Sequence, residues 1–280
     1  MQFYLRCLSS LQKFNNQKVN LLVHSDGSLE EENLSVIQNS LGCNVSFINP
    51  KDAKERTLDN LKNFPNCQKF RKNSLWGIEF FDPLFSQTDD RYSYYIDADI
   101  LFSRPFTDLF KESMIEGGAV FLEDTQWDAY SFRPWQMIGR RMRPVVVKGI
   151  TTALVFWDKR VIEWDYLEWF LSQSTYHSIS NWILPTAQAG LATRCDSKVV
   201  SANQITNLYP NATISSENFG LHLLGSYRKS WLQKIDHSAH ESRVTDAPIV
   251  TKFKKCSNRG IFAYSYKQLT RWVNTRFNKW

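Results

Sequence analysis

The 280-residue sequence predicts an α/β fold in which helices flank a mixed β-sheet. Three observations support this prediction. Segments with apolar residues at helical spacing alternate with short apolar runs from the start of the chain, as in strands joined by crossover helices. The run Tyr94–Phe102 is apolar on both sides of two carboxylates, which is typical of a strand covered on both faces. Hydrophobic residues make up 42% of the chain, enough for the core of one or two domains.

The first part of the chain alternates between the two kinds of element. Residues 1–14 and Glu30–Ser40 have helical spacing, while Val19–His24 and Val45–Ile48 have the composition of strands. Residues 50–70 are polar and mixed in charge, and we expect a loop with some helix there.

The later elements follow in the same manner. We expect a helix at Asn73–Phe85, a strand at Gly118–Leu122, two strand-like runs around Gly149 within Val145–Trp157, helices at Val161–Ser172 and Ile183–Thr193, and a strand at Gly220–Leu224. Residues 126–145 are rich in Trp, Arg and Met without a clear period, and are expected to form an active-site loop or acceptor flap. The last 45 residues are basic and lack a strand pattern. This predicts a main domain at 1–235 and a basic extension at 236–280.

Charge and cysteine content exclude several classes of protein. The formal net charge of +6 suits an anionic substrate or a membrane surface, but is too weak to indicate nucleic-acid binding. The five cysteines are scattered without a Cys-x-x-Cys pair, so neither a disulfide framework nor a zinc site is expected. A reducing compartment, and hence a cytoplasmic location, follows as the expectation. No apolar run is long enough to span a membrane.

An Asp-x-Asp motif, Asp97-Ala98-Asp99, is the first candidate site. Side chains alternate along a strand, so the two carboxylates should point the same way and repel each other unless a cation lies between them. A divalent metal that carries a diphosphate would supply this cation, because hard cations prefer oxygen ligands. The alternative for this motif alone is a solvated turn or a helix cap.

A second candidate lies more than a hundred residues later, in a strand followed by glycine and two cations. His222 could be a third metal ligand, Gly225 could let the backbone approach a phosphate, and Arg228 or Lys229 could neutralise a diphosphate. The alternative is a core histidine bonded to backbone, followed by surface cations.

Together the two segments resemble glycosyltransferases of the GT-A fold, nearest to family 8. In that family an Asp-x-Asp strand and a late His-x-x-Gly-x-x-Lys-Pro-Trp segment meet at one metal. The matching residues in this chain are Asp97, Asp99, His222, Gly225 and Trp231. The cations are shifted by one insertion, and Ser is found at 230 in place of Pro. The resemblance covers about residues 20–235 and implies a Rossmann-like mixed sheet.

The resemblance also implies roles at the nucleotide and sugar ends of a donor. Asp26 closes a strand on the nucleotide side and could face the base or ribose. The family's Asn-Ser-Gly stretch falls on Thr151-Thr152-Ala153, and its Asp-Gln pair on Ala187-Gln188. Thr152 is therefore expected at the donor sugar and Gln188 near the reacting carbon. Asp124, or Glu123 beside it, could meet the acceptor.

The function implied is transfer of a sugar from a nucleotide-sugar, with a UDP-sugar favoured, to an unknown glycan or lipid acceptor with retention of configuration. The cofactor would be Mn²⁺ or Mg²⁺, and one imidazole among oxygen ligands favours Mn²⁺. Two alternatives remain open. One is a haloacid-dehalogenase-type phosphohydrolase, in which a strand also ends in Asp-x-Asp. The other is a sugar-nucleotide binder without turnover, which the two departures at the sugar end would allow.

Two further expectations concern the ends of the chain. Residues 264–280 have apolar residues on one helical face and cations around it, which predicts either contact with an anionic membrane surface or docking on the main domain. The GT-A fold opens with a strand, whereas this sequence starts with a helical pattern, so the first strand is expected to be missing. The strand ending at His24 and the strand ending at Asp97 should then flank a gap.

Overall fold

The structure is a computed structural model, and it describes residues 2–25, 29, 31–41, 45–86, 91–124, 130–132, 136, 145–177, 180–225, 227–238, 247–259, 266 and 270. Three of the sequence predictions concern mainly other residues. Asp26 lies outside the described residues. So do the expected loop at 126–145, apart from residues 130–132, 136 and 145, and the segment 264–280, apart from residues 266 and 270.

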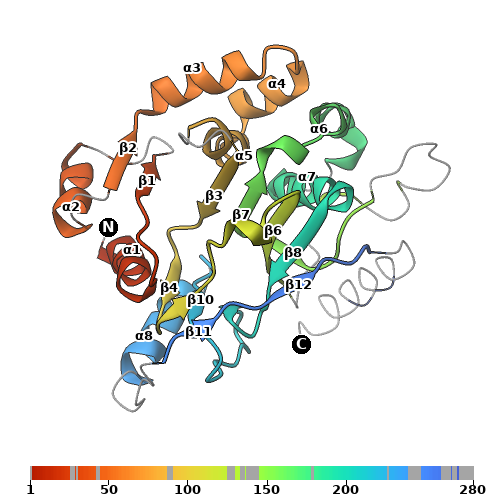
Figure 1. The fold of residues 1–280 in the computed structure, drawn as a ribbon. Coiled ribbons are helices and arrows are strands. Elements are labelled where there is room, and N and C mark those ends of the chain that lie inside the picture. Colours follow the sequence, from red (N-terminus) through yellow and green to blue (C-terminus); the bar gives the residue numbers. More distant parts are fainter. Residues whose placement is uncertain are drawn as a thin grey trace, which may run out of the picture.

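A five-stranded sheet forms the centre of the molecule, in the order β12-β8-β6-β7-β3 (Figure 1). β6 and β8 are parallel and the other neighbours are antiparallel, so the sheet is mixed, as predicted. The first of the two strand-like runs expected around Gly149 is not a strand, because Val147 makes only an isolated bridge to Asn258. The five strands are β3 (Tyr92–Ile96), β6 (Gly118–Glu123), β7 (Ile150–Asp158), β8 (Asp196–Val200) and β12 (Phe253–Lys255).

Three smaller sheets surround the central one. Their strands are β1 (Leu21–His24) with β2 (Val45–Ile48), then β4 (Ile100–Phe102) with β10 (Gly220–His222) and β9 (Ile205–Asn207), and β5 (Phe106–Thr107) with β11 (Ile249–Val250). Among the described strands β1 pairs only with β2 and β3 pairs only with β7. β1 and β3 therefore neither pair with each other nor share a neighbour among the described strands, which agrees with the expectation that they flank a gap.

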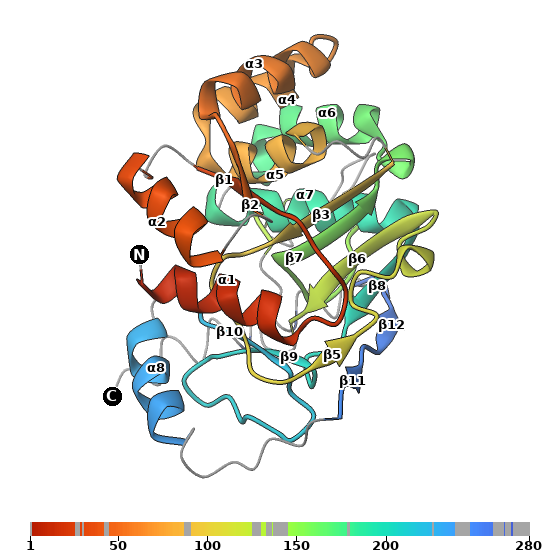
Figure 2. The same cartoon turned by 60° about the vertical axis from the view of Figure 1, so that its left-hand side comes forward.

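Helices cover both faces of the central sheet (Figures 1 and 2). Alternate residues of β6 explain why both faces are apolar: Phe121 packs in the cluster with α5, α6 and α7, whereas Val120 packs in the cluster that includes Leu11 of α1. Both side chains are fully buried. The helices are α1 (Gln2–Phe14), α2 (Glu31–Leu41), α3 (Pro50–Asn60), α4 (Pro65–Asn73), α5 (Leu75–Ser86), α6 (Trp164–Ser172), α7 (Ile183–Leu191) and α8 (Arg228–Ser238).

Two sequence expectations need correction. Residues 50–70 are largely helical, because Asn49 caps α3 by accepting a hydrogen bond from the Lys51 amide and Pro65 occupies the first turn of α4. The last 45 residues do contain strands. β12 pairs with β8 at the edge of the central sheet, so residues 253–255 belong to the main fold.

A buried carboxylate, Asp82 of α5, links this helix to three other elements. It accepts hydrogen bonds from His24 Nε2 at 2.8 Å, Thr57 Oγ1 at 2.9 Å, and Arg71 Nε and Nη2 at 2.5 and 2.7 Å. These partners belong to β1, α3 and α4 respectively. Asp82 is fully buried, so its three partners hold the end of β1 against the helical layer.

None of the helices in the described part of the chain is long and apolar enough to cross a membrane. The four cysteines that the structure describes are free thiols.

Candidate metal and donor site

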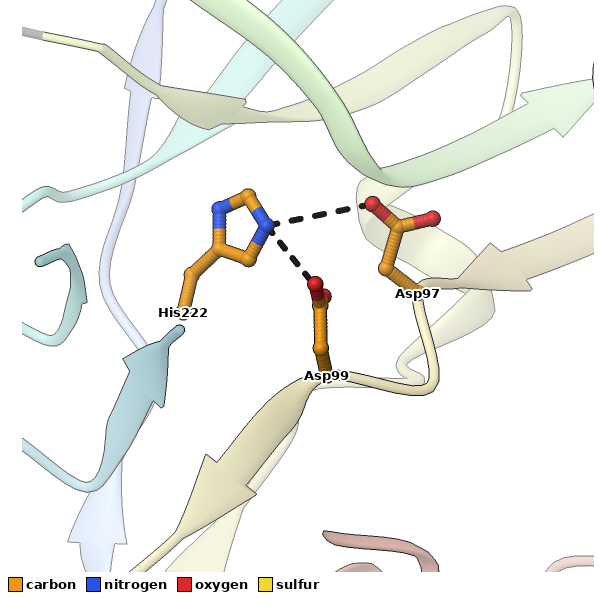
Figure 3. Close-up of side chains that lie close together, drawn as sticks. All are labelled: Asp97, Asp99 and His222. Carbon is orange, nitrogen blue, oxygen red and sulfur yellow. Dashed lines mark ion pairs between the residues drawn. The ribbon is translucent and has the colours of Figure 1, made fainter. Parts of the chain in front are cut away.

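Asp97, Asp99 and His222 lie at one point, where three strands meet (Figure 3). Asp97 follows β3, Asp99 precedes β4, and His222 is the last residue of β10. β10 pairs antiparallel with β4, which places His222 opposite Ile100. His222 Nε2 lies 3.3 Å from Asp99 Oδ1 and 3.9 Å from Asp97 Oδ2.

The two aspartates converge for a different reason than the one inferred from strand alternation. β3 and β4 belong to different sheets, and Asp97-Ala98-Asp99 forms a turn between them. The amide of Asp97 donates to the carbonyl of Ala153 on β7 at 2.8 Å, and the amide of Ile100 donates to the carbonyl of Asp97 at 3.3 Å. The turn, and not the pleat of a single strand, therefore directs both carboxylates toward His222.

The hydrogen bonds of His222 leave its Nε2 directed at the two carboxylates, where a cation could bind. Its Nδ1 lies 2.6 Å from the amide oxygen of Asn207, which can only accept, so Nδ1 carries the proton. Nε2 then faces the two carboxylates. Asp99 Oδ1 is buried and has no hydrogen-bond partner among the described residues. A divalent ion would satisfy all three acceptors.

The donor set also fits such an ion. The three ligand atoms lie within 4.8 Å of one another, and atoms each about 2.0–2.2 Å from one ion are at most about 4.4 Å apart, so a small side-chain movement would bring all three to one ion. Two carboxylates and one imidazole are ligands that Mn²⁺ accepts readily, and Mg²⁺ less so. The residues present therefore fit a divalent metal.

The two carboxylates differ in electrostatic environment. Burial raises the pKa of Asp97 to about 6, and its Oδ1 accepts a hydrogen bond from the Tyr95 hydroxyl at 2.5 Å. Burial acts on Asp99 in the same direction, but interactions with His222 and Arg228 hold its pKa below the ordinary value. Asp99 is thus the residue that stays ionised most readily.

Arg228 contacts Asp99 Oδ2, whereas His222 lies nearer to Oδ1 of the same carboxylate. Arg228 is the first residue of α8, and its Nη2 donates to Asp99 Oδ2 at 2.7 Å. Its guanidinium lies over the ring of Phe3, 4.6 Å from the ring centre, and donates to the Tyr4 hydroxyl at 3.2 Å. The structure thus brings one of the two predicted cations to the aspartates, where α1 and Asp99 together hold it.

The other residues of this predicted segment are more exposed. Lys229 is exposed, and no residue that the structure describes bonds to its side chain. Gly225 is exposed as well, and a Cβ at this position would meet no atom within 4 Å. The space beside Gly225 is therefore open. Trp231 is buried and donates from its indole nitrogen to the carbonyl of Tyr209 at 3.2 Å.

Glu79 belongs to the site although it is absent from the residues predicted from the sequence. Burial, followed by the charge of Asp97, raises the pKa of Glu79 to about 8, and Glu79 is hydrogen-bonded to Thr152 of β7. Thr152, expected at the donor sugar, is thereby placed beside the aspartates. A signal for Glu79 exists in the sequence, because α5 is an otherwise apolar helix whose only acids are Glu79 and Asp82.

The two residues predicted to act in catalysis are not part of the Asp97, Asp99 and His222 cluster. Gln188 is buried in α7, and its Oε1 has no hydrogen-bond partner within the described residues. Asp124 follows β6 and accepts from the Tyr209 hydroxyl at 2.8 Å. Gly149 packs against the Asp124 carbonyl, where a Cβ would come within 2.5 Å, and its φ of 60° also favours glycine.

Comparison with known proteins adds information on the fold. No family model and no curated protein matches the sequence. Among solved structures, the apo form of mouse xyloside xylosyltransferase 1 is similar, with a TM-score of 0.55 and 12% sequence identity. The match covers 81% of this chain and 92% of that one. At such low identity the likeness shows the fold alone. The predicted fold class is confirmed, and the chain has a glycosyltransferase-type fold.

Proposed function

We propose that this protein is a metal-dependent glycosyltransferase that moves a sugar from a nucleoside-diphosphate donor to an acceptor. One observation carries the proposal: Asp97, Asp99 and His222 converge at the end of β3 in a fold similar to that of a xylosyltransferase. The fold similarity also disfavours the phosphohydrolase alternative. The nearness to family 8, a UDP-sugar donor, retention of configuration and a cytoplasmic location are finer parts of the same proposal.

The three convergent side chains would hold Mn²⁺ or Mg²⁺. When bound, such an ion offsets the negative charge that develops on the departing nucleoside diphosphate. Arg228 already lies beside Asp99 and would add positive charge on the same side. Lys229 is free to turn toward a phosphate, and the open space beside Gly225 would admit the diphosphate.

The sugar end of the donor is assigned to residues on β7, α5 and α7. Thr152 and Glu79 form a hydrogen-bonded pair next to Asp97 and would bind sugar hydroxyls. The unpartnered Oε1 of Gln188 supports a role in ligand binding, because a buried acceptor without a donor is costly and a sugar hydroxyl could satisfy it. Asp124 would act on the acceptor side, held in place by Tyr209.

A thermal-shift panel of nucleotide-sugars with and without Mn²⁺ tests the proposal. A ligand at about 100 times its Kd stabilises a protein by about 2.7 kcal/mol, which corresponds to a rise in Tm of roughly 5 °C for a chain of this size. We expect such a rise for a UDP-sugar with Mn²⁺, and a much smaller one for either component alone. UDP-xylose, UDP-glucose and UDP-galactose should be compared.

The same panel separates the alternatives. If no nucleotide-sugar raises Tm with any divalent metal, the glycosyltransferase proposal is wrong. If UDP with Mn²⁺ binds but the UDP-sugar is neither hydrolysed nor transferred over days, the protein is a binder without turnover.

A variant at Asn207 should weaken metal binding without removing a ligand. Asn207→Leu deletes the acceptor that keeps the proton on His222 Nδ1, so that Nε2 no longer presents its lone pair to the ion in a fixed orientation. Loss of such an outer-shell partner typically costs 10–100-fold in metal affinity. Calorimetric titration of Mn²⁺ in the presence of UDP measures the change. Asn39→Leu, an exposed position on α2, is the matched control, and an equal Kd in both variants would exclude the assigned role of Asn207.

A further inference from the structure

A cavity of about 550 Å³ lies beside β9, between this strand and the loop that leads to β10. Figure 2 shows this loop as the cyan trace that runs below β9. The volume is within the range of about 300–1,000 Å³ that is usual for small-ligand pockets. Its lining is mostly composed of amides and hydroxyls, including Asn203, Thr206, Asn211, Thr213, Ser215 and Ser216.

Two lining residues connect this cavity to the metal and donor site. Asn207 lines the cavity and accepts the hydrogen bond of His222. Tyr209 lines it as well, and its hydroxyl donates to Asp124. Only the side chain of Asn207 therefore separates the cavity from the candidate ligand His222. Only the side chain of Tyr209 separates it from Asp124, the carboxylate predicted on the acceptor side.

The wall of the cavity is fixed by internal hydrogen bonds, and other polar groups are left for a ligand. Asn218 donates to the carbonyl of Asn203 and to Thr206 Oγ1, and its own oxygen accepts from the amide of Ser215. By contrast, the side chains of Asn203, Asn211 and Thr213 are exposed and have no hydrogen-bond partner among the residues that the structure describes.

The chemistry of the lining selects one class of ligand. A phosphate or nucleotide would require cations, but none of the lining residues is Lys or Arg, and the only charged one is Glu217. A lipid chain would require an apolar wall, which these residues do not provide. Uncharged amides and hydroxyls, with Tyr209 and two alanines among them, match a molecule with many neutral hydroxyls and an apolar face, which is a sugar.

We propose that this cavity binds the acceptor, and that the acceptor is a neutral oligosaccharide. The inference rests on the proposed glycosyltransferase function and adds the class of acceptor to it. The polar wall would bind the sugar chain. Asn207 lies between the cavity and His222, and Tyr209 lies between the cavity and Asp124.

Glycan binding by the full chain, without a donor, tests the proposal. The wild-type protein should be retained on an array of neutral oligosaccharides and not on sialylated or sulfated ones. The double variant Asn211→Ala/Thr213→Ala removes two free hydrogen-bonding side chains and should weaken the affinity for the retained glycan about tenfold. Thr213→Trp should remove binding, because the indole fills the cavity. Asn39→Ala/Ser40→Ala, two exposed positions on α2, should have no effect.

Stabilisation by UDP and Mn²⁺ is measured on the same variants and should be unchanged in all of them. The proposal is overturned if no neutral glycan is retained at millimolar concentration, if only charged glycans are retained, or if the double variant binds as tightly as the wild type. Glycan binding that is lost in Thr213→Trp, in a protein that UDP and Mn²⁺ do not stabilise, would support the cavity and contradict the proposed transferase function.

Discussion

Asp99→Ala is expected to abolish metal-dependent nucleotide binding while leaving the protein folded. Asp99 has the carboxylate that ionises most readily in the site, because His222 and Arg228 hold its pKa below the ordinary value despite burial. Removal of an outer-shell partner costs 10–100-fold in metal affinity, so loss of this direct ligand should cost more than about 100-fold. Asp97 and Asp99 repel each other in the absence of metal, and removing one of them relieves that repulsion. Loss of the hydrogen bond from Arg228 to Asp99 acts in the opposite direction, so the free energy of unfolding should fall modestly while the protein stays folded.

Mn²⁺ titration followed by the loss of its EPR signal, with UDP present, measures the affinity directly. Asp196→Ala is the matched control, because Asp196 is a surface carboxylate paired with Lys198 and Lys255 at the start of β8. The control should bind Mn²⁺ and UDP like the wild type. Unchanged Mn²⁺ binding in a folded Asp99→Ala protein would mean that the metal is not held at this cluster.

Elements could be predicted from the sequence where their apolar side chains form a run or recur with a regular period. They could not be predicted where helix caps or backbone pairing between strands determine the structure. β2 has the predicted bounds, and α1 and β6 agree with prediction to within a residue. By contrast, α3 buries only Ala53 and Thr57 and presents charged residues elsewhere, so it has no apolar period. β12 is an edge strand with the sequence Phe-Lys-Lys, in which the pairing with β8 comes from backbone hydrogen bonds.

The site shows the same division. The chemistry of Asp97, Asp99 and His222 could be inferred because carboxylates and an imidazole next to apolar strand residues are unusual. Glu79 could not be placed, because its position beside the aspartates depends on its hydrogen bond to Thr152 of β7, a residue much later in the chain. The role of Asn207 likewise depends on the parallel pairing of β9 with β10, which sets it opposite His222.

Asp82→Ala is expected to be among the most destabilising single substitutions in the described part of the chain. It leaves Arg71, which is only 5% exposed, without its charged partner, and it removes the acceptor of His24 and Thr57. Removing one partner of a buried ion pair typically costs about 3–5 kcal/mol, because the remaining charge stays buried. Urea denaturation should show this loss, whereas Asp59→Ala, an exposed carboxylate on α3, should change the free energy of unfolding by less than about 0.5 kcal/mol.

The dependence of stability on pH gives a second test of Asp82. Burial opposes its ionisation, but hydrogen bonds from His24 and Arg71 outweigh burial and hold the pKa of Asp82 below its ordinary value. A carboxyl whose pKa is lower in the folded state contributes stability that is complete above the unfolded pKa of about 3.9 and is lost as the pH falls through the folded pKa. The wild type should therefore lose more stability on acidification than Asp82→Ala, and the two curves should converge at low pH. Parallel curves, or a substitution that costs no more than Asp59→Ala, would mean that Arg71 finds solvent or another partner and that this network does not anchor β1 to the helices.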